Sequence, residues 1–377
     1  MDANTPSDSL RLTDGLTDPR INRTKQHSLE SIMLITLMAV ICGAESWTQI
    51  ELFGESKRKW FKTFLSLPNG IPSHDTFGRV FSLLDPQELE NWFGKWTRHL
   101  NHVSGSQLIA IDGKTLRQSF DKASKKAVIH MISAWSETNH LVLGQLTTDA
   151  KSNEITAIPQ LLRLLDIRDA TITIDAMGCQ KAIAQQIVSQ GGDYVLQVKD
   201  NHRTLHDDIK LLFDEAFEHD FEDMAYAYHQ TVEKGHGRIQ TRQCWSTWDI
   251  DYFHAWSGLR SVVCVQRTFE RVITGETGIE RRYFISTLDG RDAAKMLGVV
   301  RGHWGIENKL HWSLDVAYRE DQCRIRKGHG AENFSRMRRF SQNLLKNEKT
   351  LKVGIQSKRL QCGWNHDYLL KIVKGMI

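Results

Sequence analysis

The sequence predicts an α/β protein with a mixed sheet and flanking helices, preceded by a helical segment and interrupted late by a strand-rich stretch. Three observations lead to this prediction. Apolar residues recur at helical spacing from about 28 to 100, short β-type runs alternate with helical stretches from 108 to 199, and strand-like runs return from 229 to 288. From Gly298 onward the pattern is helical again. Strands and helices in this order are typical of a mixed sheet covered by helices.

The helical segment has recognisable starts. Ser28 stands where an N-cap is expected before a long apolar run, and Ser73 or Asp75 can cap the helix that follows the loop PNGIP at 68–72. Tryptophans near helical spacing are expected to anchor a core rather than to stack on bases: Trp47, Trp60, Trp92 and Trp96. A domain boundary is predicted at Ser104–Gly105–Ser106, where the strand pattern is about to begin.

The sheet is predicted from short runs of β-forming residues. The runs at 127–136 and 140–149 are separated by a polar turn and read as a hairpin. The remaining predicted strands lie at 108–112, 170–175 and 193–199, with helices at 153–166 and 181–190 between them.

Composition narrows the class of protein. A hydrophobic content of 40% and a charged content of 25% are ordinary for a soluble globular chain. The polar first thirty residues contain no secretory signal, and no apolar run is long enough for a bilayer, so a cytoplasmic protein without membrane contact is expected. The six cysteines are scattered without a CxxC pair, which argues against a zinc ribbon or a disulfide framework.

Charge is distributed unevenly along the chain. From Gln322 to the end there are 13 Lys+Arg against 3 Asp+Glu, so this part carries +10 while the rest must carry −6 to give the net charge of +4. A basic end on a mildly acidic body suggests a polyanionic partner, most simply nucleic acid. The alternative is a solvated helical surface. Arg336, Arg339 and Lys346 recur near helical spacing and can share one face, and the candidate phosphate contacts of this region are Arg336, Arg338 and Arg339.

Two aspartates follow short apolar strands. Asp112 follows LIAI and Asp175 follows TITI, so each carboxylate is expected at the edge of the sheet where ligands bind in open α/β folds. On parallel neighbouring strands, two such anions would repel each other unless a cation lay between them. Oxygen ligands favour magnesium or manganese over zinc. The alternative is that each Asp only favours the turn after its strand.

A third carboxylate, Glu307, lies in a predicted helix over 301–321. The expected buried stripe of this helix consists of Ile306, Leu310, Leu314 and Ala317. The neighbouring face carries His303, Glu307, His311 and Asp315 at four-residue intervals. If the helix packs on the sheet, Glu307 can reach the two aspartates. Gly302 and Gly305 would permit close approach of the helix to DNA or to the sheet.

The same helix face permits two other interpretations. His303, Glu307 and His311 could ligate zinc, but the motif HExxH is absent and the two aspartates would then have no role. The helix could also simply carry surface imidazoles. We rank the carboxylate triad first, the ordinary helix second and the zinc site third.

The motifs at these positions resemble one family. IAIDGKTLR, KSNEITAIP, TIDAMGCQK, GGDYVLQVK, HGR and HWGIENKLHWSLDV, in this order, closely resemble the bacterial H-repeat-associated proteins, which are insertion-sequence transposases of the DDE class often found beside Rhs elements. The stretch GAESWTQIELFGESK, with LPNGIPSHDTFGRVFSLLDP after it, resembles the helical segment that precedes the catalytic domain in that family. The resemblance spans roughly residues 18 to 345.

The resemblance implies an architecture and a site. It implies an N-terminal helical domain over 1–103, an RNase H-like catalytic domain over 104–345 with a β-rich insertion at about 220–290, and a basic C-terminal tail over 346–377. The catalytic and metal-binding D, D and E would be Asp112, Asp175 and Glu307. Related transposases carry an Arg and a Lys around the Glu in a Y-R-E-K pattern. Here His303 and Leu314 stand at those places, and the candidates to replace them are Arg301 and Lys309.

The function implied is a DNA transposase that performs metal-dependent cleavage and strand transfer at insertion-sequence ends. Two Mg²⁺ or Mn²⁺ ions are expected between the carboxylates and a scissile phosphate. The other expected contacts to double-stranded DNA are Lys114, Arg117, Lys199, Arg238, Arg301, His303, Trp304, Asn308 and Lys309. Trp304 and Trp312 could stack on a displaced base, although core packing is the favoured interpretation of both.

Partners and rival functions follow from the same resemblance. The expected DNA partners are insertion-sequence ends and target DNA, and a homodimer is expected because transposases usually hold two ends, although no dimer-specific heptad occurs. One rival is a structure-specific nuclease with the same RNase H-like fold, which would not need the helical region and the β insertion. The other is a catalytically decayed relic that only binds DNA, which the presence of all three carboxylates disfavours.

Overall fold

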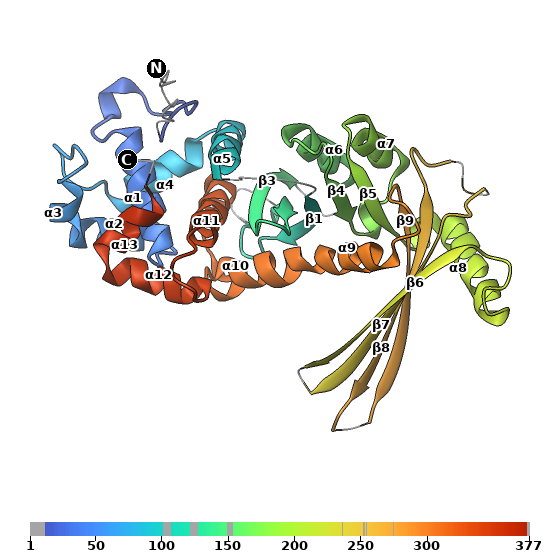
Figure 1. Ribbon diagram of the computed structural model, residues 1–377. Coiled ribbons are helices and arrows are strands. Elements are labelled where there is room, and N and C mark those ends of the chain that lie inside the picture. The colour runs from blue at the N-terminus through green and yellow to red at the C-terminus, as the bar shows by residue number, and fades with distance from the viewer. Residues whose placement is uncertain are drawn as a thin grey trace, which may run out of the picture.

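The computed structural model describes residues 12–100, 107–120, 127–148, 154–235, 237–251, 253, 255–273 and 275–374. The predicted boundary at Ser104–Gly105–Ser106 and residues 151–153 of the KSNEITAIP motif lie outside these ranges. A helical body lies at one end of the molecule, a sheet covered by helices lies beside it, and an arm of strands projects from the far side of the sheet (Figure 1).

The helical body is built from both ends of the chain. Its first part contains η1 (Asn22–Thr24), α1 (Leu29–Ile41), α2 (Trp47–Ser56), α3 (Arg58–Phe61), α4 (His74–Leu83) and α5 (Pro86–Leu100). Its second part contains α11 (Gly330–Asn347), α12 (Ile355–Trp364) and α13 (His366–Ile372). Ser28 and Ser73 cap α1 and α4 as predicted, each accepting a hydrogen bond from a backbone N–H three residues on. Trp92 and Trp96 are buried, as expected of core anchors.

The C-terminal helices complete the core of this body. Every residue of α1 except Glu30 is buried, so this helix needs apolar partners on all sides. Cys362, Leu369 and Val373 belong to the same buried cluster as α1. Residues predicted to form a basic tail are therefore largely two packed helices, because their apolar positions close the N-terminal core.

The central sheet has the strand order of an RNase H-like fold. Its strands are β1 (Leu108–Thr115), β2 (His130–Ser136), β3 (Leu141–Thr148), β4 (Thr171–Ile174) and β5 (Asp193–Val198). They lie in the order β3-β2-β1-β4-β5, in which β2 is antiparallel to β1 and β3, whereas β1, β4 and β5 run parallel. The mixed sheet and the predicted hairpin of β2 and β3 are confirmed.

The strand-rich stretch continues this sheet and does not form a second one. Its strands are β6 (Tyr226–Gly235), β7 (Arg238–Thr247), β8 (Ser261–Arg271) and β9 (Thr277–Ser286). The end of β9 pairs antiparallel with β5, from Val195 opposite Ser286 to Val198 opposite Tyr283, so the nine strands found among the described residues form one sheet. The other ends of these strands extend away from the helices as the arm seen in Figure 1.

Helices cover the two faces of the central strands. The remaining elements are α6 (Glu154–Leu164), η3 (Ala176–Gly178), α7 (Lys181–Ser189), η4 (Asp200–His202), α8 (Arg203–Glu218), α9 (Ala293–Gly305), η5 (Ile306–His311), α10 (Trp312–Val316) and η6 (Glu320–Gln322). Ile109 and Ile111 of β1 pack in one core with α6 and α7, whereas Val195 of β5 packs with α9 in another. Because side chains alternate along a strand, Ala110 and Asp112 face the opposite side of the sheet, which α9 covers.

Within the described ranges, none of the helices has both the length and the apolar character needed to cross a bilayer.

Candidate active site

The two predicted aspartates occupy matching positions on neighbouring parallel strands. Ile111 of β1 lies opposite Ile174 of β4, so Asp112 and Asp175 each come one residue later at the same level of the sheet. The expectation that Asp112 ends its strand is corrected, because β1 continues to Thr115 by pairing with β2. Both carboxylates belong to the face covered by α9, since Ile111 and Ile174 pack on the opposite face.

Local hydrogen bonds orient both carboxylates. The Oδ1 atom of Asp175 accepts hydrogen bonds from the backbone N–H groups of Met177 at 3.1 Å and Gly178 at 3.4 Å, so Asp175 caps η3 directly after β4. The Oδ1 atom of Asp112 accepts from the N–H of Gly113 at 2.8 Å. These bonds use Oδ1 of each carboxylate and leave Oδ2 for other partners, and Oδ2 of Asp112 lies 3.6 Å from Nδ1 of His311 on the helix above.

Glu307 reaches the same space from a π-helical turn. The helix α9 passes without a break into η5, where the hydrogen-bond pattern is that of a π-helix, and then into α10. Such turns are rare and occur frequently at functional sites because they change which side chains share a face. The predicted buried stripe is confirmed, with Ile306, Leu310, Leu314 and Ala317 all at most 6% exposed. Glu307 itself is exposed.

Gly302 allows this helix to approach the sheet closely. A Cβ atom at Gly302 would lie 2.1 Å from Cδ2 of Leu108 in β1. The close approach predicted from this glycine is therefore made to the sheet, and it brings the following helical turns towards the strand ends.

The three carboxylates line one cleft of about 350 Å³. Asp112, Asp175 and Glu307 contribute to its wall. The other polar residues of the lining include Gln197, Lys199, Arg282, His303, Trp304 and His311. The structure thus brings together the residues that the sequence singled out from two strands and a helix far apart in the chain.

The charge of this cleft suits a cation. Burial, together with the neighbouring carboxylates of Asp175, Glu154 and Glu307, raises the pKa of Asp112 to about 7, although the Gly113 hydrogen bond acts to lower it. Carboxylates gathered in one cleft repel one another, and their oxygen atoms are the ligands that Mg²⁺ and Mn²⁺ prefer. Among the described residues, no three Asp, Glu, His or Cys side chains are already arranged around a single point.

The two histidines of the helix are directed to different partners. Nδ1 of His303 lies 3.1 Å from Oγ1 of Thr173, and Nδ1 of His311 lies 3.6 Å from Oδ2 of Asp112. Burial lowers the pKa of His303 to about 4 and that of His311 to about 3, so both imidazoles are neutral at physiological pH. The alternative zinc site is not preformed either. Among the described residues, His303, Glu307 and His311 do not form a three-ligand group around one point.

The predicted phosphate contacts fall into several groups. Lys199 and His303 line the cleft, and Trp304 lines both the cleft and a neighbouring groove. The groove also contains Arg238, Arg301 and Asn308. Lys309 pairs with Glu137. Arg117, whose side chain is 76% exposed, lies 3.1 Å from Asp321.

The two tryptophans of the helix are exposed. Trp304 and Trp312 are 41% and 62% exposed, so the favoured expectation that they are core residues is wrong.

Lys114 is corrected from a DNA contact to a structural residue. It is 8% exposed, and its Nζ atom lies 2.7 Å from Asp315 and 3.0 Å from Asp321. These bonds tie β1 to the chain around α10. A side chain held in this way cannot also reach a phosphate outside the protein.

Arg336, Arg338 and Arg339 are likewise corrected. They are at most 2% exposed, because α11 packs between the other helices and the sheet. Nε of Arg336 lies 3.0 Å from Glu90, and Nη1 of Arg339 lies 2.8 Å from Glu320. The guanidinium of Arg338 lies 4.4 Å from the centre of the Phe334 ring. Part of the excess positive charge of this segment is therefore buried, where it pairs with carboxylates or packs on an aromatic ring and is not available to DNA.

One polar pair next to the cleft was not predicted. Nε2 of His130 and Oε1 of Glu154 are hydrogen-bonded, both residues are buried, and Nδ1 of His130 lies 3.0 Å from Oγ1 of Thr115. The pair lies against Gly113, on the face of β1 opposite Asp112. The only signals in the sequence were the Gly directly after Asp112 and the Glu of the KSNEITAIP motif.

We expect Gly113→Ala to disturb both the fold and the cleft. The added Cβ would lie 2.1 Å from Nε2 of His130 and 2.4 Å from Oε1 of Glu154, and both of these side chains are buried and hydrogen-bonded to each other. Overpacking of this kind costs about 1–3 kcal/mol of unfolding free energy. Thermal melting should show the loss, and a second variant with Glu154→Gln should not restore it. An unchanged melting temperature would contradict the tight packing described.

The chain belongs to the family of DDE-domain transposases. Residues 103–344 match the family described as "Transposase DDE domain", and residues 11–97 match the family described as "DDE_Tnp_1-associated". The resemblance to H-repeat-associated transposases is confirmed by these matches together with an H repeat-associated relative that is similar over 93% of the chain.

Several relatives are similar over almost the whole chain. "Putative protein YbfL" of Escherichia coli K12 is 43% identical over 365 residues, which cover 93% of each chain. "H repeat-associated putative transposase YhhI" of the same strain is 42% identical over the same share of both chains. Among solved structures, a piggyBac transposase synaptic complex with hairpin DNA aligns over 92% of this chain and 71% of that chain, with 11% identity and a TM-score of 0.39.

Proposed function

We propose that this protein cleaves DNA at the ends of an insertion sequence and joins those ends to target DNA, using divalent metal ions. The observation that carries the proposal is the convergence of Asp112, Asp175 and Glu307 on one cleft in a member of the DDE-domain transposase family. The catalytic residues in this proposal are these three. No Ser or Tyr nucleophile is required.

Each part of the cleft has a role in the proposal. Asp112, Asp175 and Glu307 would hold two Mg²⁺ or Mn²⁺ ions, and the oxygen donors and repelling charges of the cleft fit such ions. Bound ions would activate the attacking oxygen and stabilise the oxygen that leaves the scissile phosphate. Lys199 and Arg282 lie on the cleft wall, where each can bind a phosphate. The neutral imidazole of His303, held by Thr173, keeps the helix at a fixed distance from β4.

The genomic setting supplies a direct test of the biological part of the proposal. A transposase gene should be flanked by short inverted repeats, with direct duplications of target DNA outside them. Purified protein should then nick duplexes that carry those repeats in the presence of Mg²⁺. A host nuclease would lack the repeats and would cut by DNA structure.

We expect magnesium or manganese to support cleavage and zinc to fail. The three side chains offer only carboxylate oxygens, and the nearby imidazoles of His303 and His311 already face Thr173 and Asp112. Protein stripped with a chelator would be supplied with each ion in turn and assayed for nicking. If zinc alone restored cleavage, the site formed by His303, Glu307 and His311 would replace the carboxylate triad.

A further inference from the structure

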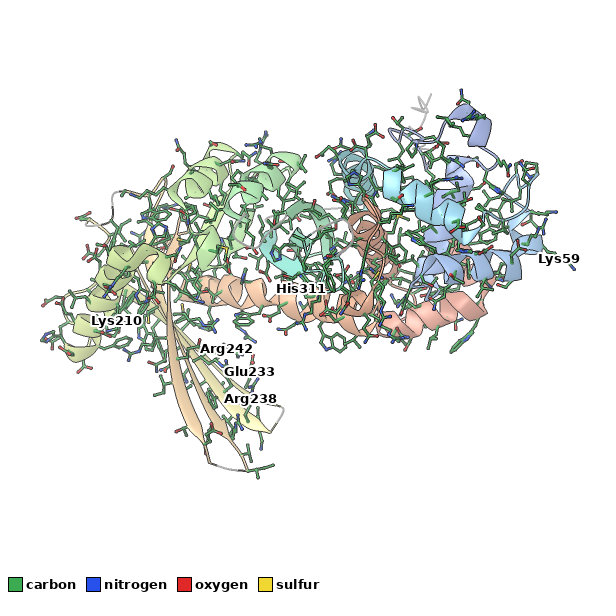
Figure 2. All side chains as sticks on the ribbon, turned by 180° about the vertical axis from the view of Figure 1, so that it is seen from behind. Lys59, Lys210, Glu233, Arg238, Arg242 and His311 are labelled. Atoms are coloured by element: carbon green, nitrogen blue, oxygen red, sulfur yellow. The ribbon has the colours of Figure 1, made fainter. Side chains whose placement is uncertain are left out.

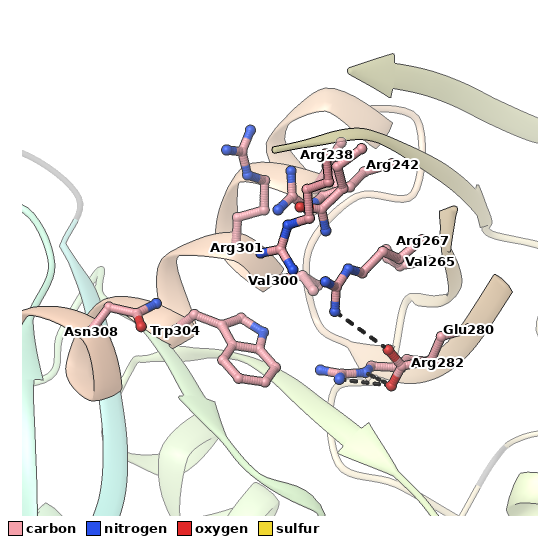
Figure 3. A pocket seen from close by; sticks show the side chains of 12 residues that line it. Arg238, Arg242, Val265, Arg267, Glu280, Arg282, Val300, Arg301, Trp304 and Asn308 are labelled. Atoms are coloured by element: carbon pink, nitrogen blue, oxygen red, sulfur yellow. Dashed lines mark hydrogen bonds and ion pairs between the residues drawn. The ribbon is translucent and has the colours of Figure 1, made fainter. Parts of the chain in front are cut away.

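A second hollow lies beside the metal cleft, at the base of the arm. This groove of about 380 Å³ is bounded by the strands of the arm and by α9. Its lining includes five arginines, Arg238, Arg242, Arg267, Arg282 and Arg301, which come from β7, β8, β9 and α9. Figure 3 shows several of these guanidinium groups directed into the same space. They are far apart in the chain and are brought together only because the arm stands beside α9.

The positive charge of this groove is incompletely paired. Glu280 is the acidic residue of the lining, and it lies 2.7 Å from Arg282 and 3.8 Å from Arg267. The Nε atom of Arg267 is buried and has no hydrogen-bond partner. No carboxylate of the described residues forms an ion pair with Arg238. A site with surplus guanidinium groups and an unused buried donor suits an anion with several oxygen atoms, such as a phosphate.

The groove adjoins the metal cleft. Arg282, Val300 and Trp304 line both hollows. The guanidinium of Arg282 lies 4.8 Å from the centre of the Trp304 ring, so these two side chains stand together at the boundary between the cleft and the groove. A polymer of phosphates bound in the cleft can therefore continue into the groove without leaving the protein surface.

Glu233, a carboxylate of the arm, forms ion pairs with two of the groove arginines. Oε2 of Glu233 lies 2.8 Å from Nη1 of Arg242, and its Oε1 accepts a hydrogen bond from Nη2 of Arg301. Glu233 belongs to β6 and Arg301 to α9, so this contact fastens the arm to the body. Figure 2 shows Glu233, Arg238 and Arg242 close together on the arm. The Glu233 side chain is 45% exposed, and exposed ion pairs of this kind stabilise a protein only slightly.

These observations point to a DNA-binding role for the groove. We infer that the arginine groove binds the phosphate backbone of DNA beside the cleavage site, and that Glu233 holds Arg242 and Arg301 in place of a phosphate until DNA displaces it. The inference rests on the proposed function for the identity of the polymer. It does not require that the three carboxylates cleave anything.

Binding measured without metal tests the groove separately from catalysis. The probe is a short labelled duplex of random sequence, titrated with full-length protein in EDTA over a range of salt concentrations. Arg242→Gln combined with Arg267→Gln should weaken binding by roughly 10- to 30-fold at physiological salt and reduce the slope of log affinity against log salt by about 1.8. Glu233→Gln should strengthen binding by about threefold to tenfold, because a competing carboxylate is lost.

Matched controls come from the same arm. Arg271 and Glu276 form an exposed ion pair at 3.1 Å outside the groove. Arg271→Gln and Glu276→Gln should therefore change the affinity and the salt slope little. Melting temperatures would establish that every variant is folded.

Three results would overturn the inference. The first is wild-type affinity and slope in the double arginine variant, and the second is an equal loss in Arg271→Gln, which would indicate only a general charge effect. The third is unchanged or weaker binding by Glu233→Gln, which would remove the role of that carboxylate. A failure of the proposed function looks different, because the wild type would then fail to cleave DNA in Mg²⁺, or Asp175→Asn would cleave as well as the wild type, whatever the groove variants bind.

Discussion

Asp112→Asn, Asp175→Asn and Glu307→Gln are each expected to abolish magnesium-dependent nicking of insertion-sequence ends while leaving the protein folded. The three side chains line one cleft, so the loss of any one would remove or misplace an ion. Substituting residues that only support metal ligands typically costs about 10- to 100-fold in activity or metal affinity, and the loss of a ligand itself should exceed that range.

Nicking of an end-containing duplex measures this effect, with metal-free DNA binding as the second readout. Glu218→Gln is a suitable control because Glu218 is an exposed carboxylate at the end of α8, outside the cleft lining. It should nick like the wild type. Near-normal nicking by any one of the three cleft variants would remove that residue from the catalytic set.

The same Asp112 variant should alter how stability depends on pH. Burial and nearby carboxylates raise the pKa of Asp112 from 3.8 to about 7, so between these values the folded protein retains a proton that the unfolded chain releases. Without metal, the wild type should therefore lose stability as pH rises from about 4 to about 7. Asp112→Asn lacks this loss and should melt at least about 2 °C above the wild type at pH 8. Equal melting curves at pH 8 would argue against the crowding of charge in the cleft.

Arg339→Ala is expected to cause the largest loss of stability among the basic residues of the C-terminal segment. Arg339 is 0% exposed and Glu320 is 2% exposed, and their ion pair at 2.8 Å joins α11 to η6. Burial alone would raise the pKa of Glu320, but Arg339 and Arg338 keep it below its ordinary value. Removing one partner of a buried pair leaves an uncompensated charge and costs about 3–5 kcal/mol of unfolding free energy.

Denaturant unfolding, read alongside DNA binding, distinguishes this structural role from a DNA contact. Arg339→Met combined with Glu320→Gln removes both charges and should recover much of the lost stability, since neutral replacement of a buried pair is often tolerated. The salt dependence of DNA binding by the folded fraction should stay as in the wild type. If Arg339→Ala instead kept full stability and lost about one unit of salt slope, the residue would be a phosphate contact.

The parts of the fold that follow local patterns could be predicted. The cap at Ser28 and the β2–β3 hairpin depend on neighbouring residues, so the chain reveals them directly. The stripe containing Ile306 and Leu310 follows helical spacing and is buried as expected. The prediction that Asp112 and Asp175 lie side by side needed one further assumption, namely that their strands are parallel neighbours. The register of β1 and β4 confirms this assumption.

What depends on distant partners could not be predicted in the same way. Arg336 looks like a surface residue until its partner Glu90, from the other end of the chain, is known. The π-helical turn at Glu307 replaces the even four-residue spacing assumed for an α-helix. The groove arginines of the arm lie on several strands, so only the pairing of those strands shows that Arg242 and Arg267 share a space.

The assembly of the helical body from both ends of the chain has a consequence for synthesis on the ribosome. The apolar helix α1 emerges early, but α11 and the helices that close its core are made last. Until then α1 exposes an apolar surface of the kind that promotes aggregation or chaperone binding. A gene copy with a stop codon shortly before Gly330 would retain Asp112, Asp175 and Glu307 and still produce a chain unable to bury α1. Loss of the final helices would therefore inactivate the protein even though the codons of the three cleft carboxylates remained intact.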